Sequence, residues 1–182
     1  MSWSAKMTLA LLLPLLIAAA PPPAPQEQPA SDAACATIRP AFPVGFEGWS
    51  VRTPLDAGAG TRSAPVLVVG RAAELRLVSF DRLTPAVTPT RIAEPSSSGG
   101  MALFQVTRPG TYRVALGGPA WIDVVRAGRS LPAMAHGHGP SCTGIRKMVD
   151  FKLAPGRYIL QLTGATAVTL PVMIAHARRV AA

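Results

Sequence analysis

The side chains best suited to chemistry in this chain lie between residues 134 and 153. This stretch holds two of the three histidines, His136 and His138, in the run His-Gly-His. Residues two apart in an extended segment point to the same side, so both imidazoles could bind one metal ion. His176 or a carboxylate would supply the third ligand, and copper, zinc or iron is the cofactor expected at such a site. In the alternative interpretation the nearby glycines form a tight turn, the imidazoles hydrogen-bond to backbone groups, and no cofactor is bound.

Arg146 and Lys147 follow the histidines and fall on opposite faces of an expected strand. Either side chain is a candidate contact for an anion or a partner, and the alternative is a solvated charge or an ion pair with Asp150. Ser141 lies nearby, but the surrounding sequence lacks the pattern of a nucleophile elbow. No phosphate-binding glycine loop or dinucleotide fingerprint occurs. The sequence therefore assigns no catalytic residue and predicts no nucleotide cofactor.

The chain has two cysteines, Cys35 and Cys142. In an exported protein an even pair of cysteines predicts a disulfide. The bond would pin the start of the folded part to the loop after His138. If Cys142 were instead a thiolate ligand of a metal, Cys35 would be left unpaired.

The N-terminus predicts export. Lys6 precedes a mainly apolar run over residues 7–17, and the alanines at 18–20 are typical of a signal-peptidase site. A membrane-spanning helix needs about 20 apolar residues, whereas prolines at 21–23 end this run early. The expected organisation is a signal peptide (1–20), a Pro/Ala-rich tether (21–34) and one domain (35–182), with cleavage after Ala20 or a few residues later. We expect the mature chain to be periplasmic or secreted and to have no transmembrane span.

After residue 60 the apolar residues recur with the period of strands. Alternation is clear at 74–78, 101–106, 111–116, 145–153, 158–162 and 168–174, with Pro171 indicating that the last strand is an edge or contains a bulge. About eight short antiparallel strands at this spacing predict an all-β domain, either a β-sandwich or a jelly roll.

A short internal repeat occurs in this region. The run Pro109-Gly110-Thr111-Tyr112 recurs as Pro155-Gly156-Arg157-Tyr158, each time shortly after a phenylalanine. Proline followed by glycine is typical of a type II turn, so we expect two equivalent hairpins. The alternative is a duplicated binding edge.

The formal net charge of +9 raises the question of a polyanionic partner. The arginines are scattered along the sequence, aromatic residues are few, and the chain is expected to be exported. These features argue against nucleic acid as a partner.

Several runs in the second half of the chain are similar to small exported proteins of alphaproteobacteria, especially sphingomonads. The runs are YRVAL at 112–116, WIDVV at 121–125, HGHGP at 136–140, Cys142, residues 144–151 and LAPGRY at 153–158. Many members of that family carry the label homogentisate 1,2-dioxygenase, which implies ferrous iron held by two histidines and a glutamate. No glutamate follows Glu94 here, so a distant glutamate, Asp123 or Asp150 would have to complete the set.

Two interpretations of function remain. In the first, the protein is a non-catalytic binding or structural module that contacts an unknown envelope component or protein partner. In the second, it is a metal-binding protein, including a dioxygenase-like oxidoreductase, that uses His136 and His138. The first predicts no stoichiometric metal, and the second predicts loss of the metal when either histidine is replaced.

Overall fold

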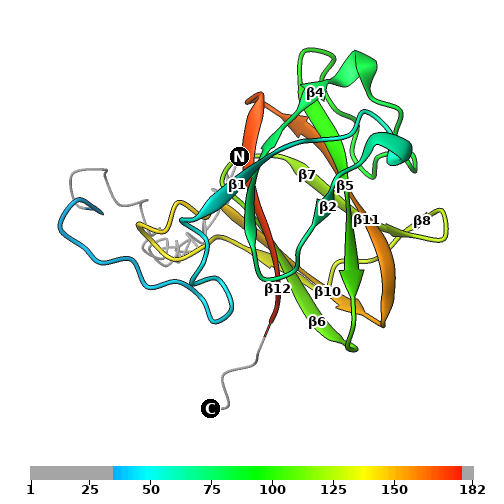
Figure 1. Ribbon diagram of the computed structural model, residues 1–182. Coiled ribbons are helices and arrows are strands. Elements are labelled where there is room, and N and C mark those ends of the chain that lie inside the picture. Colours follow the sequence, from blue (N-terminus) through cyan, green and yellow to red (C-terminus); the bar gives the residue numbers. More distant parts are fainter. Residues whose placement is uncertain (1–34, 178–182) are drawn as a thin grey trace, which may run out of the picture.

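The computed structural model describes residues 35–177 (Figure 1). The expected signal peptide and tether, and residues 178–182, lie outside this part of the chain. Within it, no helix has both the length and the apolar character needed to cross a membrane.

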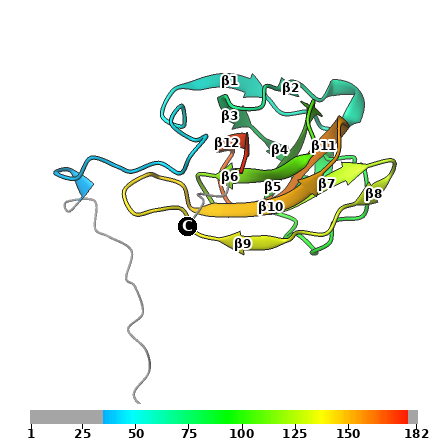
Figure 2. The same ribbon diagram turned by 90° about the horizontal axis from the view of Figure 1, so that it is seen from below.

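Two β-sheets form the domain, so the predicted all-β sandwich is confirmed. The first sheet contains, in spatial order, β1 (Arg52–Asp56), β3 (Ala72–Arg76), β12 (Thr169–His176), β6 (Gly110–Leu116), β10 (Lys147–Leu153) and β9 (Ala135–Gly137). The second contains β2 (Val66–Leu67), β5 (Ser98–Val106), β11 (Gly156–Ala165), β7 (Trp121–Arg126) and β8 (Arg129–Ser130), and β4 (Val78–Ser79) also pairs with β5. The short 3-10 helices η1 (Thr61–Ser63) and η2 (Phe80–Arg82) lie in the connections. Figure 2 shows the strands of the first sheet following one another from β1 to β9.

Residues 35–177 form twelve strands, whereas about eight antiparallel strands were expected. Most of the additional strands, including β4, β8 and β9, are only two or three residues long. A segment of that length is too short to show an alternating pattern. The pairings of β1 with β3 and of β2 with β5 are parallel, so both sheets are mixed.

The main core fills the space between the sheets. Each long strand buries alternate side chains there, as Val149, Phe151 and Leu153 do on β10. Across the core, β5 and β11 contribute Phe104 and Tyr158, whose rings stack with their centroids 5.4 Å apart. This alternation follows from the period of two in a pleated strand.

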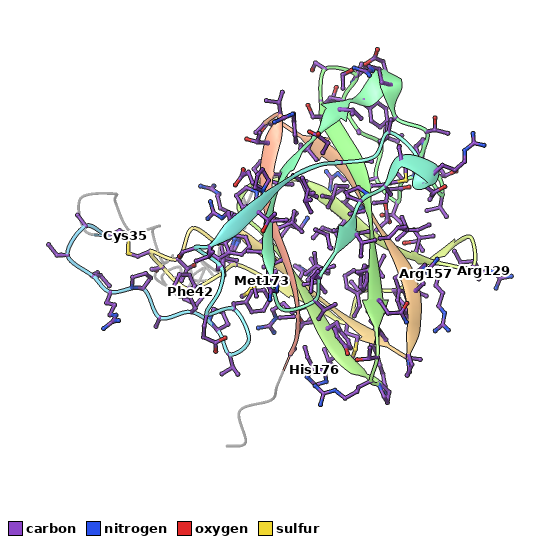
Figure 3. All side chains as sticks on the ribbon, in the orientation of Figure 1. Cys35, Phe42, Arg129, Arg157, Met173 and His176 are labelled. Carbon is purple, nitrogen blue, oxygen red and sulfur yellow. A yellow bond between two sulfur atoms is a disulfide. The ribbon has the colours of Figure 1, made fainter. Side chains whose placement is uncertain are left out.

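A second apolar cluster lies on the outer face of the first sheet. The segment 42–49, which we call the cover segment, places Phe46 and Trp49 against Met173 of β12 and Ile145. Both aromatic side chains are completely buried. Figure 3 shows Phe42, at the start of the cover segment, near Met173. The cover segment therefore covers part of the outer face of the first sheet.

The predicted disulfide between Cys35 and Cys142 is present, with a Cα–Cα distance of 5.1 Å. It joins the chain that leads into the cover segment to the loop between β9 and β10. The bond thus fixes the cover segment at a point outside the sheets, as Figure 3 shows for Cys35.

The predicted hairpins at the two Pro-Gly runs are wrong. β5 belongs to the second sheet and β6 to the first, and β10 and β11 are likewise in different sheets. Both Pro-Gly runs are therefore arches that carry the chain from one sheet to the other. A local turn motif does not determine whether the next strand pairs with the previous one or crosses the core, which is why the sequence pattern was misleading.

The two arches share one structural device. The Tyr112 hydroxyl donates to the carbonyl of Arg108 at 3.0 Å, and the Tyr158 hydroxyl donates to the carbonyl of Ala154 at 2.7 Å. Each tyrosine thus reaches back four residues and ties its own arch, as in the tyrosine corners of other sandwiches. The internal repeat in the sequence therefore corresponds to these two tyrosine corners.

The expectation that Pro171 marks an edge strand or a bulge is also wrong. β12 lies between β3 and β6, and Pro171 pairs in register with Glu74 of β3. Pairing with β6 begins only at Val172, and the Pro171 carbonyl accepts a hydrogen bond from the Gly117 N–H, just past the end of β6. The nitrogen that lacks a hydrogen is thus placed where the neighbouring strand has already ended.

Candidate functional site

A pocket of about 560 Å³ opens at the end of the sandwich opposite the arches. Its volume is in the range of small-molecule sites. Residues of both sheets and three loops form it: Arg91, Ile92, Ala93, Glu94, Gly118, Pro119, Ala120, Trp121, His136, Gly137, His138, Arg146, Lys147, Thr163 and Gly164. Four of the residues singled out in the sequence, His136, His138, Arg146 and Lys147, meet here.

Lys147 has an unusual position for a charged residue. Because it alternates with Val149 and Phe151, it lies on the core-facing side of β10, at the open end of the sandwich. Its Nζ donates to the carbonyl of Ala120 at 2.8 Å and lies 4.7 Å from the centre of the Trp121 ring. Partial burial lowers the pKa of Lys147, and the nearby charge of Arg91 lowers this pKa further.

Trp121, the first residue of β7, forms a wall of the pocket and is held in a fixed orientation. Its Nε1–H donates to the Thr90 hydroxyl, which in turn donates to Asp123 Oδ1 at 2.9 Å. The guanidinium of Arg91 lies over the Trp121 ring, 5.5 Å from the ring centre. Two cations thus face the π system of one aromatic side chain, an arrangement that favours the cations electrostatically.

The loop that carries Arg91 is attached to the second sheet by buried polar groups. Gln161 Oε1 accepts hydrogen bonds from the backbone N–H groups of Ala86 and Val87, at 2.8 and 3.3 Å. Gln161 Nε2 donates to the Val87 carbonyl and to Asp123 Oδ2. Gln161 and Asp123 are 0% and 1% exposed. Satisfied polar groups at this depth fix geometry, so this wall of the pocket has a defined position.

The histidine run forms the opposite side of the pocket. His136 lies on the edge strand β9, in register with Val149 of β10. His138 Nδ1 is 2.9 Å from the carbonyl oxygen of Arg146 and closes the loop whose tip carries Cys142. Both histidines and Arg146 are exposed at the pocket rim.

The proposed third histidine is not brought to the other two. His176 ends β12, where its ring makes an edge contact with Tyr112 at 5.2 Å, and strands β6 and β10 separate β12 from β9. Asp123 is occupied by the hydrogen bonds described above, and Asp150 forms a two-point ion pair with Arg113, at 2.6 and 2.7 Å. Between residues 35 and 177 no group of three His, Cys, Asp or Glu side chains is placed to hold a metal ion.

The pocket is strongly positive. Arg91, Arg146 and Lys147 form no ion pair with a carboxylate of the described residues, and Glu94 is the single acidic residue in the wall. Thr163, which pairs with Trp121 across β11 and β7, is completely buried, and its hydroxyl has no hydrogen-bond partner in the described chain. Ile92, Ala93 and Pro119 add apolar surface. The arrangement suits a molecule with an anionic group and an apolar body.

Sequence reasoning found one side of this site and missed the other. In the sequence Trp121 stands out only as part of the run WIDVV at 121–125, Thr163 does not stand out at all, and Arg91 is one of many scattered arginines. The available signal was Trp121, because tryptophan is enriched at binding surfaces, where part of the ring is buried and part reaches solvent. The approach of Arg91 depends on a loop held by Gln161, a residue 70 positions away, and a sequence pattern does not reveal such a contact.

Comparison with models of known protein families found no match, and comparison with curated proteins found no significant match.

Proposed function

We propose that the protein is an exported, non-catalytic binding module that holds a small amphiphilic anion in the pocket between Trp121 and Lys147. The observation that carries this proposal is a pocket lined by three cationic side chains without carboxylate partners among the described residues, two of which face one oriented tryptophan. The Cys35–Cys142 disulfide supports an oxidising compartment, typical of periplasmic and secreted proteins.

Charge supplies the main reason to expect an anion. Lys147 is partly removed from water, and its ammonium hydrogen-bonds only to a backbone carbonyl among the described groups. Burying a charge is costly unless it is paired. A bound carboxylate or phosphate would provide the missing counter-charge for Lys147 and also contact the nearby Arg91.

Trp121 and Ile92 give the reason to expect an apolar body as well. Ile92 is 97% exposed beside the pocket, and the ring of Trp121 forms part of the wall. Burial of apolar ligand surface against them would add roughly 25 cal/mol for each Å² removed from water. An anion with a short alkyl chain should therefore bind more tightly than a bare anion.

The test is calorimetric titration of the native protein with hexanoate, acetate and hexylammonium. Replacement of a charged hydrogen-bond partner costs about 1.5–3 kcal/mol, so we expect Lys147→Met to weaken hexanoate binding roughly 10- to 150-fold. Lys152→Met is the matched control, because Lys152 lies on the same strand but on its exposed face. The proposal fails if both variants bind alike, or if hexylammonium binds as well as hexanoate.

A second proposal is a metal-binding protein, including the oxidoreductase implied by the family resemblance. It is supported by the contact of His138 Nδ1 with a backbone carbonyl, because metal-binding histidines commonly use their second nitrogen in this way. The native mass of protein isolated without chelators tests it. A stoichiometric metal in the wild-type protein that is lost in His136→Ala/His138→Ala would favour metal binding. A wild-type mass that equals the mass of the polypeptide alone would exclude the histidine pair as metal ligands.

A further inference from the structure

A second charged region lies at the arch end of the sandwich, away from the pocket. It consists of five exposed cations, which together we call the arch surface: Arg108, Arg126, Arg129, Lys152 and Arg157. No aspartate or glutamate occurs in the segments that carry them, 105–112, 124–131 and 151–160. Arginines scattered in the sequence are thus gathered by the fold at one end of the sandwich. On β10 an acidic side chain, Asp150, lies two residues before Lys152, and it is paired with Arg113.

Strand register places the segments that carry these residues at one end of the sandwich, with Lys152 on the outer face of the first sheet and Arg157 on the outer face of the second. Val106 pairs with Gly156 in the second sheet, and Gly110 pairs with Leu153 in the first, so the two arches lie side by side. Arg108 lies within the first arch, and Lys152 and Arg157 flank the second. Arg129 faces Arg126 across the β7–β8 turn. Figure 3 shows Arg129 and Arg157 on the side of the molecule away from Cys35.

Arg126 is built into this surface by several contacts. Its Nη1 donates to the Tyr158 hydroxyl at 2.9 Å and its Nη2 donates to the Pro155 carbonyl at 3.2 Å. The guanidinium also lies over the Tyr158 ring, 5.2 Å from its centre. Gly156 has φ +151°, and a Cβ at this position would be 2.8 Å from Arg126 Nη2. The backbone of the second arch therefore has the shape needed to hold a fixed positive charge at its surface.

We propose that the arch surface docks the protein on a membrane that contains anionic lipids. Clustered basic side chains are attracted to the negative surface of such a membrane, and Pro109 and Pro155 are exposed among these cations at the arches. Tyr112 and Tyr158 are buried, so the arches offer no exposed ring for stacking with nucleic-acid bases. In the docked orientation the pocket, at the opposite end of the sandwich, faces away from the lipid. This proposal does not depend on what the pocket binds.

Partition of the native protein onto vesicles tests the proposal. We compare phosphatidylcholine vesicles with vesicles that also contain phosphatidylglycerol. A basic residue close to an anionic membrane contributes about 1 kcal/mol, or roughly fivefold in partition. We therefore expect Arg129→Gln/Lys152→Gln/Arg157→Gln to bind the anionic vesicles on the order of a hundredfold more weakly. Wild-type binding should also fall as salt is added, because exposed charges are screened within about 10 Å at 0.1 M.

The control variant is Arg39→Gln/Arg76→Gln/Arg82→Gln, which removes the same charge from exposed positions outside the arch surface. It should retain most of the binding. Equal losses in the two triple variants would show that net charge alone is responsible and would overturn the proposal. Equal binding to the two kinds of vesicle would also overturn it. Tighter binding to dextran sulfate than to anionic vesicles, with the same dependence on the arch surface, would show a polysaccharide partner instead.

Discussion

The two tyrosine corners allow a stability comparison with an internal control. Tyr112→Phe removes one hydrogen bond, from the hydroxyl to the Arg108 carbonyl, and Tyr158→Phe removes two, to Ala154 and from Arg126. Both rings are buried and remain in place. A neutral hydrogen bond contributes about 1 kcal/mol, and one to a charged group about 1.5–3 kcal/mol when it is shielded. Because Arg126 is exposed to solvent, we expect its hydrogen bond to the Tyr158 hydroxyl to contribute about as much as a neutral hydrogen bond. We expect the free energy of unfolding to fall by about 1 kcal/mol for Tyr112→Phe and about 2 kcal/mol for Tyr158→Phe.

Urea unfolding of the oxidised protein measures this difference, provided that the slope with denaturant is unchanged. The excess cost at Tyr158 is assigned to Arg126, so Tyr158→Phe in an Arg126→Gln background should cost only about as much as Tyr112→Phe. An equal cost for the two single variants, or an excess that persists without Arg126, would refute the reasoning.

Two further predictions concern the disulfide and Lys147. Cys35→Ser/Cys142→Ser should lower the free energy of unfolding by up to about 4–5 kcal/mol in the chain-entropy model. The same variant should make Trp49 more accessible to acrylamide. If Trp49 stays protected, packing alone holds the cover segment in place. Because the pKa of Lys147 is lowered in the folded protein, the unfolded chain keeps this proton to higher pH, so stability should rise with pH between the folded and unfolded pKa values. Lys147→Met should lack this rise in urea titrations at alkaline pH, and a fall in the wild type specific to Lys147 would contradict the assigned cause.

The strand pattern predicted the long strands because residues such as Val149 and Phe151 alternate with polar neighbours. It did not predict the sheet to which a strand belongs. The Pro-Gly runs were interpreted as hairpins, yet they are arches, because the partner of each strand is chosen by core packing across the whole domain. The expectation drawn from Pro171 was wrong for the same reason. Whether a proline fits inside a sheet depends on where the neighbouring strand, here β6, ends.

The candidate site was predicted in part. His136, His138, Arg146 and Lys147 meet at one pocket because they lie close in sequence and flank a single loop. The contributions of Arg91 and Trp121 come from distant segments that meet only in the folded protein. The expected involvement of His176 assumed that the three histidines converge, whereas the order of strands keeps β12 and β9 apart.

The cover segment has a consequence for how the protein reaches its folded state. Phe46 and Trp49 lie near the beginning of the described chain, but they pack on Met173 and Ala175 of its last strand. Contacts between such distant residues form late, because closing a long loop costs entropy before packing can compensate. A chain that enters its compartment from the N-terminus would expose these two aromatic side chains until β12 arrives. During that interval the chain would be open to aggregation and would be a client for holding chaperones.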